Sequence, residues 1–338
     1  MRSSARAAWR LGAGGVLAVT VVLGLRARGA HGDRGDPARA VVTVPRAHWG
    51  GGEFAEMVPP IRLPTSMNGD DHLTVWLHVP DGGRIGVARA DGRATLVYPA
   101  GTIADRVEMR EPAGVDGEHA FRVIDVRGTR IAEDGEYFHC LQPSAAEEPP
   151  LVGFEWRRGD DDAERRATDG IAELVRARLT GADDEARRSA AERFRRLNRC
   201  ASCHDHDRPE RTRVSEGGPR RATDRAGFYV VLGVLGDAAP LETHRPRDLN
   251  AGDPYVTVSC GASAARLDAG ASGAATGAAY TCPDGRVPVA RFDVARALAA
   301  GQRHAVEVCR SRRYLYEHMD GAARDAFAPA FEACALPR

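Results

Sequence analysis

The hydrophobic pattern of the chain changes from the period of a strand to that of a helix near residue 159, and this change constrains the fold more than any other feature of the sequence. From about residue 70 to residue 156, apolar and polar side chains alternate. In the run 73–79, leucine and valine fall at every second position, which gives a strand one apolar face. Asp-Gly turns at 81–82 and 91–92 separate such runs. The spacing predicts a small antiparallel β domain over residues 66–158, built as a sandwich or a barrel.

Beyond residue 159 the apolar residues recur with the period of a helix. Two apolar stripes follow each other closely, and the second leads directly to Cys200. The first stripe contains Ile171, Leu174, Val175 and Leu179, and the second contains Ala186, Ala190, Phe194 and Leu197. Strand-like runs occur at 228–235, 255–259 and 287–292, and the tail returns to helical spacing. We therefore expect an α+β multi-domain chain in which residues 159–338 are mainly helical with a few short strands.

The first 32 residues have the composition of an export signal. A basic start is followed by the apolar run 11–25, which is shorter than the ~20 residues that a membrane-spanning helix needs. We expect a cleaved signal peptide at 1–32 in preference to a retained N-terminal anchor, and a linker rich in Gly, Pro and Arg at 33–65. The bulk of the chain is then periplasmic or secreted, or is held at the membrane by residues 11–25.

The charge balance argues against one large class of partners. Lys and Arg total 47, Asp and Glu also total 47, and the formal net charge is zero, so no general attraction to nucleic acid or to an anionic membrane is expected. The sequence has no Gly-x-Gly-x-x-Gly after a strand-like run, no P-loop and no Gly-x-Ser-x-Gly elbow. We expect no nucleic-acid partner, and no membrane contact other than an N-terminal anchor.

The most informative motif is Cys200-Ala201-Ser202-Cys203-His204. A chain of 338 residues with 7 Cys and 11 His would contain about 0.005 Cys-x-x-Cys-His motifs by chance. Two thiols at this spacing can form thioether bonds to the two vinyl groups of one haem, and the adjacent histidine can then bind the iron as its proximal ligand. The sequence predicts one covalently attached haem c.

Residues 191–204 (AERFRRLNRCASCH) resemble the haem-attachment segment of c-type cytochromes, in which a helix with an aromatic residue leads into the two cysteines. Many small cytochromes c carry the aromatic four positions before the first cysteine, where this chain has Arg196. The resemblance implies that Cys200 and Cys203 attach the haem and that His204 binds its iron. It also implies a cytochrome-c-like haem region within 159–338 and redox partner proteins.

The sequence leaves the second axial ligand of the iron open. Met319, His244 and Met67 are candidates, because methionine and histidine are common axial ligands of electron carriers. Each also has an ordinary interpretation, since a single methionine usually fills a core and a single surface histidine is usually solvated. An open sixth position is the remaining alternative.

Five further cysteines bear on the compartment. If the chain is exported, Cys260–Cys282 and Cys309–Cys334 are the natural disulfides by proximity, although other pairings of these four residues are equally allowed. This assignment places Cys140 outside the disulfides, and we expect it to be buried beside the strand that ends at Phe138.

We favour an exported monohaem c-type cytochrome that carries electrons over a catalyst. The length of the chain is also consistent with a haem enzyme whose sixth iron position is open. Such an enzyme could be peroxidase-like or similar to cytochrome P460, although the P460 family uses a lysine cross-link and this chain has no lysine. A structural zinc site is a third interpretation, because Cys200, Cys203, His204 and His206 supply suitable ligand types. A thioredoxin-like redox pair would need a βαβ pattern that the sequence does not show.

Overall fold

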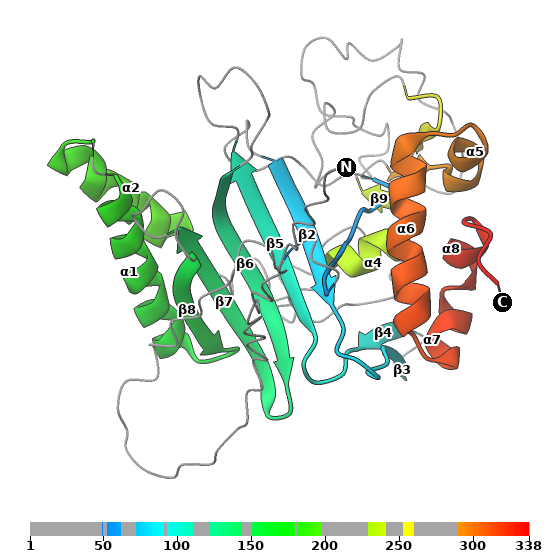
Figure 1. The fold of residues 1–338 in the computed structure, drawn as a ribbon, viewed down its shortest axis with the longest axis horizontal. Helices are drawn as coiled ribbons and strands as arrows, with labels where there is room; N and C mark the ends of the chain where they lie inside the picture. Colours follow the sequence, from blue (N-terminus) through cyan, green and yellow to red (C-terminus); the bar gives the residue numbers. More distant parts are fainter. Residues whose placement is uncertain are drawn as a thin grey trace, which may run out of the picture. The chain divides into compact units, whose positions relative to one another are not determined.

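The main feature of the structure is a six-stranded antiparallel sheet with strand order β1-β2-β5-β6-β7-β8 (Figure 1). Its strands are β1 (Ala55–Glu56), β2 (His72–His78), β5 (Ile103–Arg110), β6 (Arg122–Ala132), β7 (Gly135–Pro143) and β8 (Leu151–Arg157). A hairpin joins β3 (Gly86–Ala90) to β4 (Arg93–Val97), and a small sheet has the order β10-β11-β9. Its strands are β9 (Ala238–Pro240), β10 (Val256–Ser259) and β11 (Val289–Phe292).

This computed structural model describes residue 49 and the ranges 53–61, 72–90, 93–110, 122–143, 151–179, 181–197, 229–240, 253–259 and 289–337. All of these residues belong to the unit formed by residues 36–338.

Seven helices fall within the described ranges. They are α1 (Asp161–Arg178), α2 (Asp184–Leu197), α4 (Tyr229–Leu235), α5 (Val294–Ala299), α6 (Arg303–His318), α7 (Gly321–Ala326) and α8 (Ala328–Glu332). Aspartate side chains cap four of them: Asp160, Asp183, Asp293 and Asp320 accept hydrogen bonds from the first-turn amides of α1, α2, α5 and α7. These contacts satisfy donors that have no partner within the helix itself, which fixes where each helix begins.

Helix α1 lies on the β7–β8 end of the sheet (Figure 1). Its small buried residues, among them Ala163 and Ala167, pack against Phe138 and Trp156 of the sheet. Small side chains on this face let the helix backbone approach the strands closely. The same approach explains Gly170, because a Cβ atom there would collide with the ring of Phe154.

The β1–β2–β5 end of the sheet shares a second core with the C-terminal helices. This cluster joins Val75, Leu77 and Ala104 of the strands to residues of α4, α6, α7 and α8. Its helical members are Val231, Val234, Leu235, Leu315, Ala323, Ala330 and Phe331. The cluster thus combines residues from both sides of residue 158, where the sequence predicts a domain boundary.

The structure corrects the expected fold class. About 40% of the described residues are helical and 34% are in strands, so the expectation of a mainly helical, cytochrome-c-like region at 159–338 is wrong. The helical stripe of α1 packs on the large sheet, and the region also contributes strands β9, β10 and β11. The expected small sandwich or barrel is instead one large sheet together with a hairpin.

The expected strand at 228–235 is also wrong, because residues 229–235 form helix α4. A short apolar run rich in valine fits a buried strand as well as a buried helix, and its period cannot separate the two. No helix in the described ranges is long and apolar enough to cross a membrane, and the expected signal or anchor at 11–25 lies outside those ranges.

Candidate functional site

The three predicted haem-binding residues, Cys200, Cys203 and His204, lie outside the described residues. The same is true of two candidate axial ligands, His244 and Met67. The structure does describe α2, the helix that leads to the motif, and only residues 198 and 199 separate its last residue from Cys200.

Helix α2 makes polar contacts at both of its ends, and those near its C-terminal end hold it against α1. At its start, Asp183 Oδ1 accepts a hydrogen bond from the amide of Ala186 at 2.7 Å. Near its end, the guanidinium of Arg195 bonds to Asp169 at 2.9 Å and to Glu173 at 2.8 Å, and both acceptors lie on α1. The hydrogen bond that Arg195 donates to Asp169 raises the pKa of Arg195. The chain therefore reaches residue 197 in a defined position.

Phe194 is the aromatic residue within 191–204, the segment that resembles the haem-attachment segment of c-type cytochromes. It is half-buried and packs against the cluster of Phe138, Cys140 and Trp156. The guanidinium carbon of Arg127 lies 5.7 Å from the centre of its ring, which is within the range of a cation–π contact. Phe194 thus anchors α2 to the sheet.

Met319 occupies the core. Its side chain is completely buried, and it lies in the same cluster as Leu315 and Ile85. The backbone at Met319 also forms a parallel bridge to Ile85. A thioether enclosed in this way fills space between apolar neighbours, as the ordinary interpretation of the sequence proposes.

The structure supports one of the two proposed disulfides. Cys309 and Cys334 are bonded, whereas Cys260 and Cys282 lie outside the described residues. Cys140 is buried as expected, but the strand does not end at Phe138, because β7 continues to Pro143 and contains Cys140. Its thiol lies 3.9 Å from Asp125 Oδ1.

The sheet also carries a buried pair that sequence spacing did not reveal. His139 Nε2 donates to Asp105 Oδ1 at 2.7 Å, although β6 lies between the strands that carry the two residues. The β6 residue between them is Gly128, which is opposite Asp105 in one ladder and opposite His139 in the other. A Cβ atom at Gly128 would collide with both side chains. The missing side chain therefore makes room for the pair.

Trp49 completes this cluster by donating from Nε1 to Asp105 Oδ2 at 3.0 Å. Asp105 and His139 are 3% and 8% exposed, so the carboxylate depends on these donors in place of water. The pair holds β5 and β7 together across the middle strand. Among the described residues, no three His, Cys, Asp or Glu side chains are arranged to hold a metal ion.

A second polar group centres on Asp125 of β6. Arg127 bonds to it at 2.8 Å, Arg106 lies within 3.5 Å, and Gln142 also donates to it. Arg178 of α1 reaches the same region by bonding to Gln142 at 3.1 Å. These contacts connect the sheet to α1 and explain how Asp125 is tolerated at 6% exposure.

One signal in the sequence could have pointed to the Asp105–His139 pair. A glycine inside a strand often marks a close approach of other atoms, and Gly128 is such a residue within 122–132. The identity of the two partners still depends on strand order and register, which spacing along the chain does not give.

Comparisons with known proteins give this chain no relative: no protein-family model, no curated protein and no solved structure matches it.

Proposed function

We propose that this chain is an exported monohaem c-type cytochrome that carries electrons between redox partner proteins. The proposal rests on the sequence Cys200-Ala201-Ser202-Cys203-His204. It does not include a cytochrome-c-like fold, which the described residues contradict.

The donor set of the motif fits a covalently held haem. Cys200 and Cys203 supply the two sulfur atoms for the thioether bonds, and His204 supplies an imidazole nitrogen for the iron. The haem supplies one-electron chemistry at its iron when it is bound. The chain's own contribution is to hold the ring, to provide the proximal ligand and to exclude water.

The states of the other cysteines support the assignment of Cys200 and Cys203 to haem attachment. The Cys309–Cys334 disulfide is typical of an oxidising compartment, where c-type haem attachment and disulfide formation can occur in the same exported chain. Cys140 is a buried thiol. Of the four remaining cysteines, Cys200 and Cys203 are the two that lie within four residues of His204.

The anchoring of α2 supports a fixed attachment point. Phe194 and Arg195 tie the end of this helix to the sheet and to α1, so the polypeptide enters the motif from a rigid element. A cofactor bound to such an element keeps its orientation, which favours electron transfer with a defined partner geometry.

A pyridine haemochrome spectrum of the protein, produced in cells that attach haem to exported chains, tests the proposal. We expect a covalent-haem spectrum that survives acid–acetone extraction. The Cys200→Ser/Cys203→Ser variant should lose it, and the matched control Cys260→Ser/Cys282→Ser should keep it. A wild-type protein that folds but shows no haem, or equal loss in both variants, would contradict the proposal.

A haem enzyme with an open sixth position is the second candidate. Burial of Met319 in the core favours it, because one of the proposed axial ligands is already used in packing. Carbon monoxide should change the spectrum of the reduced protein if the sixth position is open, and should leave it unchanged if a strong second ligand is present. If metal analysis instead finds zinc and no iron, the structural zinc interpretation replaces both.

A further inference from the structure

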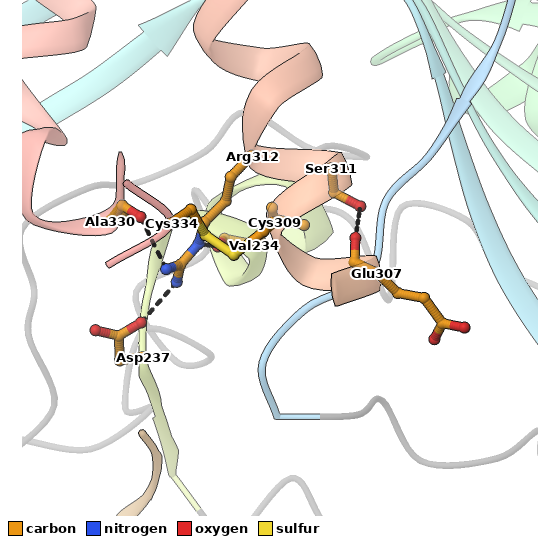
Figure 2. The surroundings of a disulfide bond; sticks show 8 residues. All are labelled: Val234, Asp237, Glu307, Cys309, Ser311, Arg312, Ala330 and Cys334. Atoms are coloured by element: carbon orange, nitrogen blue, oxygen red, sulfur yellow. Dashed lines mark hydrogen bonds and ion pairs between the residues drawn. A yellow bond between two sulfur atoms is a disulfide. The ribbon is translucent and has the colours of Figure 1, made fainter. Parts of the chain in front are cut away.

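The side chain of Arg312, on α6, is fully buried and joins three separate parts of the chain (Figure 2). Its Nε donates to the carbonyl of Val234 at 2.9 Å, and its Nη1 donates to the carbonyl of Ala330 at 2.9 Å. Its Nη2 donates to Asp237 Oδ1 at 2.6 Å. One guanidinium therefore binds residues from the end of α4, from α8 and from the start of β9.

The two carbonyl acceptors are both at helix ends. Val234 lies in the last turn of α4, and Ala330 lies in the last turn of α8. Carbonyls at these positions have no partner within their own helix and carry the negative end of the helix dipole. A cation that bonds to both satisfies two helix ends at once, so α4 and α8 each depend on the position of Arg312.

Burial lowers the pKa of Arg312, and the hydrogen bond and charge of Asp237 oppose this effect. Asp237 is about one-third exposed, whereas the Arg312 side chain is 0% exposed. The charge is thus tolerated inside the core only while its acceptors stay in place.

The disulfide lies beside this cluster. Cys309 precedes Arg312 by three residues on α6, so both side chains project from the same side of the helix (Figure 2). Cys334 follows α8, and its bond to Cys309 holds the chain end beside Arg312. The next residue, Ala335, has φ of 54°, a left-handed conformation that favours glycine. The turn after α8 is closed by backbone hydrogen bonds from Ala335 N to Glu332 O at 2.9 Å and from Leu336 N to Phe331 O at 3.1 Å, and the disulfide ties this turn to α6.

We propose that the Cys309–Cys334 disulfide is a redox-controlled latch on α4, which acts through Arg312. In the oxidised chain the disulfide keeps the Ala330 carbonyl on Arg312, and Arg312 holds the end of α4. When the bond is reduced, the turn after α8 is no longer tied to α6, and α8 moves away from the guanidinium. Water then enters the cluster and α4 loses its C-terminal partner. This inference does not depend on haem attachment.

The chemical step is thiol–disulfide exchange with a dithiol. One thiolate of the dithiol attacks a sulfur of the bond and forms a mixed disulfide, and its second thiolate then releases the chain. The dithiol loses two electrons and becomes a disulfide, while Cys309 and Cys334 gain them and end as thiols. Cys309 is half-buried and Cys334 is 7% exposed, so Cys309 is the sulfur more open to attack.

Hydrogen exchange of the full-length protein, measured by mass spectrometry with and without dithiothreitol, tests the latch. On reduction we expect exchange in α4 to rise about tenfold or more, because the helix opens locally, while exchange in β5, β6 and β7 stays constant. Cys260→Ser/Cys282→Ser serves as the background, so that Cys309–Cys334 is the disulfide that responds. If α4 does not respond, or if the sheet responds equally, the latch is excluded.

The variant Arg312→Met, with its neighbour Arg313→Met as the control, shows whether the disulfide acts on α4 through Arg312 or only stabilises the end of the chain. Arg312→Met should raise exchange in α4 of the oxidised protein as much as reduction does, and reduction should then add little more. Arg313 is exposed, so its substitution should leave α4 unchanged. Effects of reduction and of Arg312→Met that simply add would show that the disulfide and α4 are independent, and would overturn the proposal. If Arg312→Met does not fold, hydrogen exchange with and without dithiothreitol in the chain that keeps Arg312 still tests the proposal.

Discussion

Two buried charge clusters of this chain, one around Asp105 and one around Arg312, are held in place in different ways. Asp105, Gly128 and His139 lie on three neighbouring strands, so the ladder hydrogen bonds of the sheet set their positions. The partners of Arg312 come from separate elements that meet through tertiary packing and a covalent bond. We therefore expect the first cluster to remain while the sheet remains, and the proposed latch would let the second open without global unfolding.

The sheet fixes the position of the Asp105–His139 pair, whereas the position of the Arg312 cluster depends on tertiary contacts between separate elements. In the sheet, the polar pair replaces an apolar contact between β5 and β7 and leaves no freedom to rearrange. In the C-terminal helices, a single guanidinium serves several helix ends, so a change at one end is transmitted to the others. Substitutions in the two clusters should therefore differ in the free energy of unfolding that they remove and in how far from the substituted residue the structure is affected.

The largest effect is expected for Arg312→Met. The substitution leaves the carbonyls of Val234 and Ala330 buried without their donor, and breaking a buried charged pair of this kind costs about 3–5 kcal/mol. Urea unfolding measures this loss, with Arg313→Met as the control that removes an exposed charge from the same helix. A loss below about 1 kcal/mol would mean that water readily replaces the guanidinium.

A smaller effect is expected for Gly128→Ala. The new methyl group meets both Asp105 and His139, and overpacking of a core costs about 1–3 kcal/mol. Gly181→Ala is the matched control, because a Cβ atom there meets no other atom within 4 Å. In the Asp105→Ala/His139→Ala background the cost of Gly128→Ala should nearly vanish. An unchanged cost in that background would show that the close approach at Gly128 is not what matters.

The smallest effect is expected for Arg195→Gln. This side chain is 37% exposed, and its ion pairs with α1 are therefore screened by water. Exposed pairs contribute about 0.2–1 kcal/mol, so unfolding should shift only slightly. Because Arg195 precedes Cys200 by five residues, the haemochrome yield of this variant is a second readout. A loss comparable to that of Arg312→Met would remove the contrast between exposed and buried charges.

The sequence predicts local structure better than it predicts how the elements meet. Alternation at 73–79 corresponds to β2, and the helical spacing of the tail corresponds to the helices α5 to α8. The stripe of α1 correctly predicts a helix, but the same stripe could pack on another helix or on a sheet, and only the structure shows the sheet. The run at 229–235 is too short for its period to decide between strand and helix.

The candidate sites also differ in how far the sequence alone can predict them. Pairing Cys309 with Cys334 was one of several assignments that the sequence allowed, and the structure selects it. The contact between Asp105 and His139 needs strand order and register, so no spacing rule finds it. The Cys200–His204 motif is the opposite case, because its chemistry is local and can be read from five consecutive residues.

Intact mass and peptide mapping of the mature protein, isolated from cells that attach haem to exported chains, test the central claim most directly. The account predicts a mass higher than that of the polypeptide by one haem, with the added mass on the peptide that contains Cys200 and Cys203. A correctly folded protein with an intact Cys309–Cys334 bond and the mass of the bare polypeptide would contradict it.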